Sequence, residues 1–175
     1  MKDFYYNKIS KSFNELYGEE QKKKMQIILK FLPKKPKPKS ILDVGCGSGL
    51  STPKNQCGID PSKELIKLHE GYKEGRALVG SAEKLPFKNE QFDYVISVTA
   101  LHHTNIKKSL REIKRVVKSC KKEHKTTKRI LKANVIISIL KKAKNFKQIE
   151  KEINEVFKVK ERIDEGKDIV FILQV

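Results

Sequence analysis

The segment Ile41–Gly49, with the sequence ILDVGCGSG, constrains the fold of this chain more than any other. Its short apolar run is typical of a buried strand, and its alternating glycines let the backbone turn tightly and approach a ligand. A second short run, Gly58–Asp60, ends on a carboxylate soon afterwards. Open α/β sheets bind ligands at the carboxyl ends of their strands. The two segments together predict a nucleotide-cofactor site.

The chain has 175 residues, enough for one domain with its own core but too few for a second substrate domain. Its apolar runs are far shorter than the roughly 20 residues of a membrane helix, and the N-terminus lacks the apolar core of a secretory signal. We therefore expect a soluble, cytoplasmic protein with no membrane association. The cysteines Cys46, Cys57 and Cys120 form no CxxC pair, which argues against disulfides and against a structural metal site.

The net charge of +18 favours a polyanionic partner such as RNA. Only five of the 39 basic residues are arginine, however, and a lysine-rich composition is also typical of heat adaptation. The tract Lys118–Lys132 holds seven basic residues against the single acidic Glu123. It is either a solvated loop or, on the rim of the site, an attractor of a phosphate backbone.

Hydrophobic spacing predicts helices that alternate with strands. Residues 4–32 have helical spacing, with Gly18 as a candidate break, and Pro33–Lys39 cannot be helical because its prolines remove backbone donors. Later helices are expected at residues 61–69, with Leu65 and Leu68 inward, at 106–118, and at 145–157, capped by Asn145. Strands are expected at residues 40–44, 56–60, 76–80, 92–98, 134–140, 159–163 and 169–175.

This order predicts an α/β fold, a Rossmann-like three-layer sandwich. Strands that alternate with helices form parallel sheets, and the terminal hairpin adds an antiparallel strand. We expect a mostly parallel seven-stranded sheet with an antiparallel C-terminal strand.

Four motifs in order resemble the class I S-adenosylmethionine-dependent methyltransferases, in particular the small single-domain members related to the ubiquinone-biosynthesis type. They are Leu42–Gly49, Gly58–Ser62, Gly80–Phe87 and Phe92–His103. The resemblance covers nearly the whole chain and implies S-adenosylmethionine as the cofactor. It implies one methyltransferase domain over residues 1–175, with a helical lid at 1–32, a Lys/Pro linker at 33–39 and a cofactor-binding core at 40–175.

The resemblance also assigns cofactor-binding residues. It implies that Gly45 and Gly47 present the turn to the cofactor, that Asp43 receives the ammonium of the methionine moiety, and that Asp60 accepts hydrogen bonds from the ribose hydroxyls. Asp43 and Asp60 could instead serve only as structural or capping groups. The other implied cofactor residues are Cys46, Gly49, Pro61, Ser81, Ala82, Glu83, Thr99, Leu101 and Tyr17.

His102 and His103 are weak candidates for a general base, since the pKa of histidine suits proton removal near neutrality. They could equally cap or pack the following helix, and no other catalytic residue is indicated. Tyr5, Tyr6 and Tyr17 either face the sulfonium cation from the lid or pack the helix onto the sheet.

The chain departs from the family pattern in three places. Ser81 stands where many relatives carry an acidic residue beside the adenine. Few residues separate Gly49 from Asp60, so the first crossover helix can have a turn or two at most. The tract Lys118–Lys132 replaces the Pro-Gly-Gly turn that usually precedes the fifth strand.

The resulting hypothesis is a methyltransferase acting on a nitrogen, oxygen or carbon of an acceptor, with RNA or a ribonucleoprotein slightly favoured over a small molecule. Part of the motif set resembles tRNA and ribosomal-RNA methyltransferases that work with a small partner subunit. The alternatives are a non-catalytic module that binds cofactor or RNA, and a small-molecule methyltransferase. A nicotinamide reductase is disfavoured because Gly45–Gly49 reads G-x-G-x-G rather than G-x-G-x-x-G.

Overall fold

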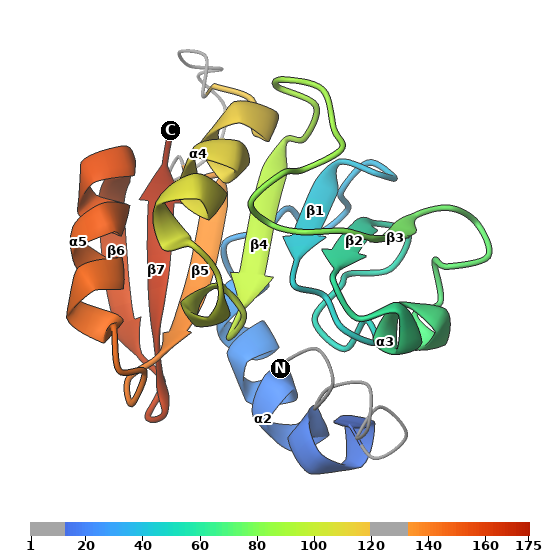
Figure 1. Ribbon diagram of the computed structural model, residues 1–175, viewed down its shortest axis with the longest axis horizontal. Coiled ribbons are helices and arrows are strands. Elements are labelled where there is room, and N and C mark those ends of the chain that lie inside the picture. Colours follow the sequence, from blue (N-terminus) through green and yellow to red (C-terminus); the bar gives the residue numbers. More distant parts are fainter. Residues whose placement is uncertain (1–12, 120–132) are drawn as a thin grey trace.

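The computed structural model describes residues 13–119 and 133–175 (Figure 1). The early elements are α2 (Phe13–Ile28), β1 (Ile41–Val44), β2 (Cys57–Asp60), α3 (Lys63–Leu68) and β3 (Ala77–Val79). They are followed by β4 (Tyr94–Val98), the 3-10 turn η1 (Leu101–His103) and α4 (Ile106–Val116). The chain closes with β5 (Val135–Leu140), α5 (Phe146–Val156), β6 (Lys158–Asp164) and β7 (Asp168–Gln174).

All seven strands form one sheet in the order β3-β2-β1-β4-β5-β7-β6. β1 pairs in parallel with β2 and β4, and the outer pairs β2–β3 and β4–β5 are parallel as well. β7 runs antiparallel to both β5 and β6. The predicted mostly parallel sheet with an antiparallel C-terminal strand is confirmed. The mainly apolar and almost wholly buried strands β1 and β5 suit this sheet because parallel strands are buried on both faces.

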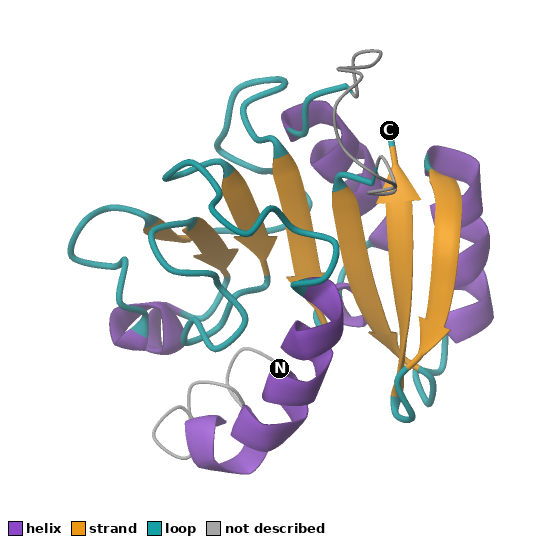
Figure 2. Ribbon diagram, turned by 180° about the vertical axis from the view of Figure 1, so that it is seen from behind, coloured by secondary structure: helices purple, strands orange, loops and turns teal. Residues whose placement is uncertain are grey.

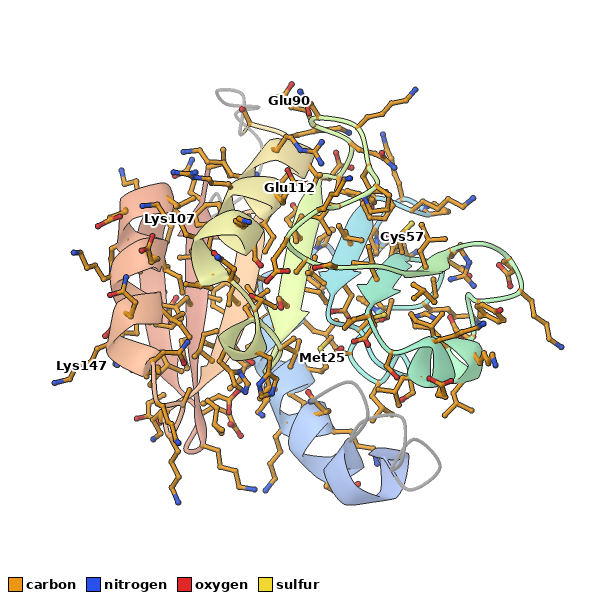
Figure 3. The ribbon with its side chains drawn as sticks, in the orientation of Figure 1. Met25, Cys57, Glu90, Lys107, Glu112 and Lys147 are labelled. Atoms are coloured by element: carbon orange, nitrogen blue, oxygen red, sulfur yellow. The ribbon has the colours of Figure 1, made fainter. Side chains whose placement is uncertain are left out.

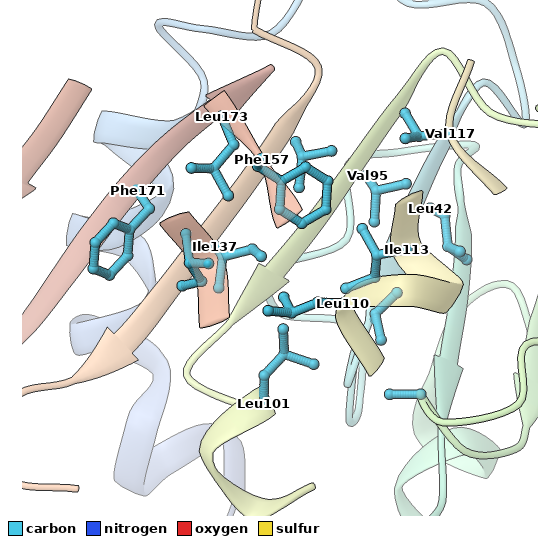
Figure 4. Close-up of a cluster of buried hydrophobic side chains, with 14 of the residues drawn as sticks. Leu42, Val95, Leu101, Leu110, Ile113, Val117, Ile137, Phe157, Phe171 and Leu173 are labelled. Carbon is cyan, nitrogen blue, oxygen red and sulfur yellow. The ribbon is translucent and has the colours of Figure 1, made fainter. Parts of the chain in front are cut away.

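Helices cover both faces of the sheet. α4 and α5 lie in front of it in Figure 1, and Figure 2 shows α2 on the opposite side. The core under α4 and α5 contains Leu42, Val95 and Ile137 from the strands, packed against Leu110 and Ile113 of α4 (Figure 4). These apolar side chains are fully buried, as helical and strand spacing predicts.

A second apolar cluster fastens α2 to the opposite face. Met25 and Ile28 of α2 pack with Ile96 of β4, Ile136 of β5 and Ile172 of β7. α2 is therefore held by the middle of the sheet, next to the carboxyl end of β4.

Two helix details differ from the sequence-based expectation. The break at Gly18 is wrong, because α2 runs continuously from Phe13 to Ile28, and a single glycine costs a helix only about 1 kcal/mol. The inward position of Leu68 is also wrong. Leu68 is 51% exposed, whereas Ile66 is buried together with Leu65, because α3 packs this side against β2 and β3.

Two other predicted features are the cap of α5 and the short segment between β1 and β2. Asn145 is the N-cap residue of α5, as predicted, but its side chain accepts no capping hydrogen bond. The segment between β1 and β2 contains turns and no helix, in keeping with its shortness. Residues 4–12, with Tyr5 and Tyr6, and most of the basic tract fall outside the described residues.

Within the described ranges 13–119 and 133–175, none of the helices combines the length and the apolar character that crossing a bilayer requires.

Candidate functional site

A cavity of about 460 Å³ opens at the carboxyl ends of β1, β2 and β4. The loops that follow these strands form most of its wall. The predicted residues that line it are Gly45, Cys46, Gly47, Asp60, Pro61, Ser81, Ala82, Thr99, Leu101, His102 and His103. The tertiary structure thus brings most of the predicted site residues to one place.

The glycine turn after β1 bends back onto β2. The backbone N–H groups of Gly45 and Cys46 both donate to the carbonyl of Ile59, at 2.8 and 3.2 Å. Gly45 and Gly47 have φ values of +81° and +54°, a region in which glycine is favoured. A Cβ atom on Gly45 would overlap the Cβ of Ala100 in the loop after β4. The turn therefore depends on glycine for both conformation and space.

Asp60 at the end of β2 is held in a fixed orientation at the cavity wall. One carboxylate oxygen accepts a hydrogen bond from the Gly47 N–H at 3.0 Å, and the other accepts from the Ser62 N–H at 2.8 Å. Ser62 in turn caps α3 by accepting from the Leu65 N–H. The carboxylate joins the two strand tips and presents its charge to the cavity.

Asp43 lies beneath the turn rather than in the cavity wall. It is fully buried, and one of its oxygens accepts hydrogen bonds from the hydroxyls of Ser51 and Thr52, at 2.6 and 2.8 Å. Its other oxygen is buried and has no hydrogen-bond partner among the described residues. Ser51 lines the cavity, so it stands between Asp43 and the open space.

Burial raises the pKa of Asp43 to about 6, although the hydrogen bonds from Ser51 and Thr52 oppose this shift and the charge of Asp60 adds to it. A buried carboxylate is costly in its charged form unless a cation or a donor accompanies it. A cation placed near its unpartnered oxygen would stabilise the ionised state.

This shift predicts a pH dependence of stability. The ordinary pKa is 3.8, so between about pH 4 and pH 6 the folded chain binds this proton more tightly than the unfolded chain does. The contribution of Asp43 to the free energy of unfolding should fall by up to about 3 kcal/mol as pH rises through this window. Denaturant unfolding of wild type and Asp43→Asn at pH 4.5 and 7 measures it. The free energy of unfolding of wild type minus that of Asp43→Asn should decrease from pH 4.5 to pH 7. A difference that does not change with pH would contradict the shift.

Gly49 and Glu83 do not line the cavity. A Cβ atom on Gly49 would lie 2.7 Å from the ring of buried His69, whose Nε2 is 3.1 Å from the Thr52 hydroxyl. The Glu83 carboxylate accepts hydrogen bonds from the Ser81 hydroxyl and from the Asn105 N–H. Gly49 therefore packs behind the turn, and Glu83 ties the loop after β3 to the start of α4.

His102 and His103 lie in η1 with their ring centroids 3.9 Å apart, and both line the cavity. Cys46 also lines it, and burial raises the pKa of its thiol, which keeps the sulfur protonated. Tyr17 belongs to α2, but its side chain is outside the described part, so its place at the cofactor stays a prediction.

Several lining residues were not predicted from the sequence. Ser62, Gly80 and Ala100 lie inside three of the four motifs, next to predicted site residues, and that position is the signal that could have found them. Gln21 and Lys167 come from α2 and from the β6–β7 hairpin, and they carry no local signal. The others are Val44, Leu50, Ser51, Ile59, Leu65, Val98, Thr104 and Leu140.

The sheet order, the glycine turn after β1 and the carboxylate after β2 define one class of protein, the class I S-adenosylmethionine-dependent methyltransferases. The model of the methyltransferase domain family matches residues 42–120, from β1 to just beyond α4. The match spans the strands whose carboxyl ends border the cavity and a little under half of the chain.

Among curated proteins, the chain is 40% identical over 119 residues to an uncharacterised protein of Methanocaldococcus jannaschii, covering 65% of this chain and 46% of that protein. It is 32% identical over 119 residues to the tRNA (carboxymethyluridine(34)-5-O)-methyltransferase of Saccharomyces cerevisiae, covering 63% of this chain and 43% of the yeast enzyme. The chain thus spans about half the length of the curated relatives it matches.

Solved structures share the fold at low identity. An S-adenosylmethionine-dependent methyltransferase from Thermotoga maritima superposes with a TM-score of 0.69 at 16% identity, over 96% of this chain and 97% of that one. A chain from the complex of the Haloferax volcanii Trm112 methyltransferase activator gives 0.70 at 14% identity, over 97% and 98%. At these identities the likeness establishes the fold alone.

Proposed function

We propose that the chain binds S-adenosylmethionine in this cavity and transfers its methyl group to a nucleophilic acceptor. The observation that carries the proposal is the Asp60 carboxylate, held by two backbone N–H groups at the junction of the glycine turn and α3. A carboxylate fixed in this way suits the paired hydroxyls of a ribose. The glycine turn admits the backbone approach that the adenosyl group needs, and the cavity volume of about 460 Å³ suits one cofactor-sized ligand.

The methionine end would lie toward Asp43 and Thr99. The buried carboxylate of Asp43 would attract the ammonium group through Ser51 or a water molecule, and Thr99 and Leu101 would flank the methionyl chain. The methyl group would then face the space between η1 and Lys167. Positioning and exclusion of water would supply most of the rate enhancement.

Calorimetric titration with S-adenosylhomocysteine, the demethylated product, tests the cofactor assignment, with NADH as the control ligand. We expect one site for the former and no heat of binding for the latter. Tritium transfer from labelled cofactor into an acceptor tests turnover. Binding without transfer to any component of a cell extract would favour the non-catalytic module, and absence of binding would contradict the proposal.

We propose RNA as the acceptor because exposed lysines gather at the edge of the sheet that carries the cavity. They follow β5, begin α4 and α5, and occupy the β6–β7 hairpin, and Lys147 projects outward from α5 (Figure 3). These lysines are Lys107, Lys108, Lys141, Lys142, Lys144, Lys147 and Lys167. In the turn between β6 and β7 one acidic side chain is exposed, that of Asp164, and it pairs with Lys141 at 2.8 Å. Similarity to the yeast tRNA methyltransferase supports the same acceptor class.

A charge-reversal pair tests this acceptor class. Lys142→Glu with Lys144→Glu should lower the rate of transfer to bulk tRNA about tenfold at low salt, because two phosphate contacts become repulsive. The matched control is Lys34→Glu with Lys35→Glu, exposed lysines of the linker before β1. Equal effects of the two pairs would contradict an acceptor path over this edge. Salt-insensitive methylation of a small amine would favour the small-molecule alternative.

A small partner subunit is the remaining proposal. The chain from the Trm112 complex supports it through its fold. The edge strand β3 also leaves Val79 50% exposed, and Leu68 and Tyr72 of the α3 region are exposed apolar side chains as well. Co-expression with a Trm112-type activator, followed by light scattering and tritium transfer, tests it. A heterodimer with raised activity is expected, and an unchanged monomer would contradict it.

A further inference from the structure

Lys24 and Asp168 form an ion pair in which neither side chain has any exposure to solvent. Lys24 belongs to α2, and Asp168 is the first residue of β7, so the pair joins the first described helix to the last strand. The Lys24 Nζ lies 3.3 Å from one carboxylate oxygen of Asp168. It also donates a hydrogen bond to the Thr99 hydroxyl at 2.9 Å.

Thr99 stands between the two charges. Its hydroxyl donates to the second carboxylate oxygen of Asp168 at 2.7 Å, and the Ser138 hydroxyl donates to the same oxygen at 3.0 Å. The φ of Thr99 is 55°, which a β-branched residue seldom adopts, so its surroundings must impose it. The Thr99 N–H, which donates to Ser138, and the side-chain hydrogen bonds to Lys24 and Asp168 together provide that restraint.

This cluster lies at the wall of the cavity. Thr99 lines the cavity, and so does Gln21, which precedes Lys24 by about one helical turn and lies on the same side of α2. Met25, the neighbour of Lys24, lies near the tip of β4 in Figure 3 and packs against Val98. The ion pair therefore fastens α2 where the helix borders the cavity.

Stability alone does not explain a buried pair at this point. The apolar contacts of Met25, Ile28 and Leu32 already attach α2 to the sheet. Apolar residues of similar volume are often as stabilising as a buried ion pair, whereas charged pairs select one geometry among several. The pair is accordingly suited to define a single position of α2.

We propose that Lys24, Thr99 and Asp168 are positioning residues that hold α2 across the cavity and limit the rate of cofactor exchange. The inference rests on the proposed binding of S-adenosylmethionine in this cavity. Lys24 and Asp168 act on the cofactor through the placement of α2 and of the loop after β4, and Thr99, which lines the cavity, connects them to it.

The test is the double variant Lys24→Met with Asp168→Asn, which removes both charges and keeps an oxygen to accept from Thr99 and Ser138. Its matched control is Arg162→Met with Glu150→Gln, which removes a partly exposed pair between β6 and α5, outside the cavity lining. Hydrogen exchange without ligand should be about tenfold faster in residues 21–28 of the first variant and unchanged in α4. Release of S-adenosylhomocysteine should also be about tenfold faster, with the control within twofold of wild type.

These measurements distinguish failure of this proposal from failure of the cofactor assignment. Unchanged exchange in α2 together with an unchanged release rate would overturn the proposal. Lys24→Met alone should melt at a lower temperature than the double variant, because it leaves a lone buried charge. Ser138→Ala, which removes one donor to Asp168 and leaves both charges paired, supplies the same two measurements if the double variant does not fold. Failure of the wild-type chain to bind S-adenosylhomocysteine would refute the cofactor assignment, while exchange in α2 would still decide whether the pair holds the helix.

Discussion

The Asp60→Ala variant should bind S-adenosylhomocysteine about 100-fold more weakly than the wild-type chain. The substitution removes the proposed acceptor of two ribose hydroxyls, and hydrogen bonds to a charged group contribute about 1.5–3 kcal/mol each. It also releases the Gly47 and Ser62 N–H groups that the carboxylate now holds at 3.0 and 2.8 Å. Isothermal calorimetry measures the dissociation constant directly.

Asp93→Ala is the matched control, because Asp93 is a partly exposed carboxylate before β4, paired with Lys118 at the opposite end of the sheet. It should bind the product as wild type does. Asp60→Asn, which keeps one acceptor oxygen, should fall between wild type and alanine. Undiminished affinity in Asp60→Ala would remove this residue from the site.

Gly45→Ala should lower the free energy of unfolding by about 2–5 kcal/mol. Part of the loss, about 1–2 kcal/mol, comes from forcing alanine to a φ of +81°. The rest comes from overlap of the new methyl group with the Cβ of Ala100, since overpacking of this kind typically costs about 1–3 kcal/mol. Denaturant unfolding with a fluorescence or circular-dichroism readout measures the loss, and cofactor binding should fail with it.

Two variants separate these contributions. Gly75→Ala imposes the same kind of strain at φ +64°, but nothing lies within 4 Å of its Cβ, so only the conformational cost should remain. Gly45→Ala combined with Ala100→Gly removes the overlapping methyl group and should recover the steric part. Equal losses in Gly45→Ala and Gly75→Ala would show that the approach of Ala100 is unimportant.

The strands of the sheet were predictable because their signals are local. β1, β4 and β5 are short apolar runs with polar or glycine residues at their ends, and this pattern survives any arrangement of the rest of the chain. Helix faces were less predictable. Leu68 and Ile66 both suit an apolar face, and only the packing of α3 against β2 and β3 selected Ile66 for burial.

The residues of the candidate site also differ in how far the sequence could predict them. Gly45, Gly47 and Asp60 belong to strand tips that the sequence marks, and the parallel sheet brings these tips together at one edge. Asp43 is marked by the same motif, yet its burial behind Ser51 and its raised pKa arise from the turn between β1 and β2. Sequence spacing alone does not distinguish a residue in the wall from one behind it.

The strand tips and the glycine turn could be inferred from the amino-acid order, because each depends on neighbouring residues and their periodicity, and the four motifs carried the resemblance to the family. The position of α2 beside the cavity could not be inferred in this way. Lys24 and Asp168 come from distant parts of the chain, and a lysine in a helix and an aspartate beside a turn are usually solvated. Folding placed both in the core with Thr99 between them, because close packing of α2 on the sheet left no water to hydrate either charge and each became the partner of the other.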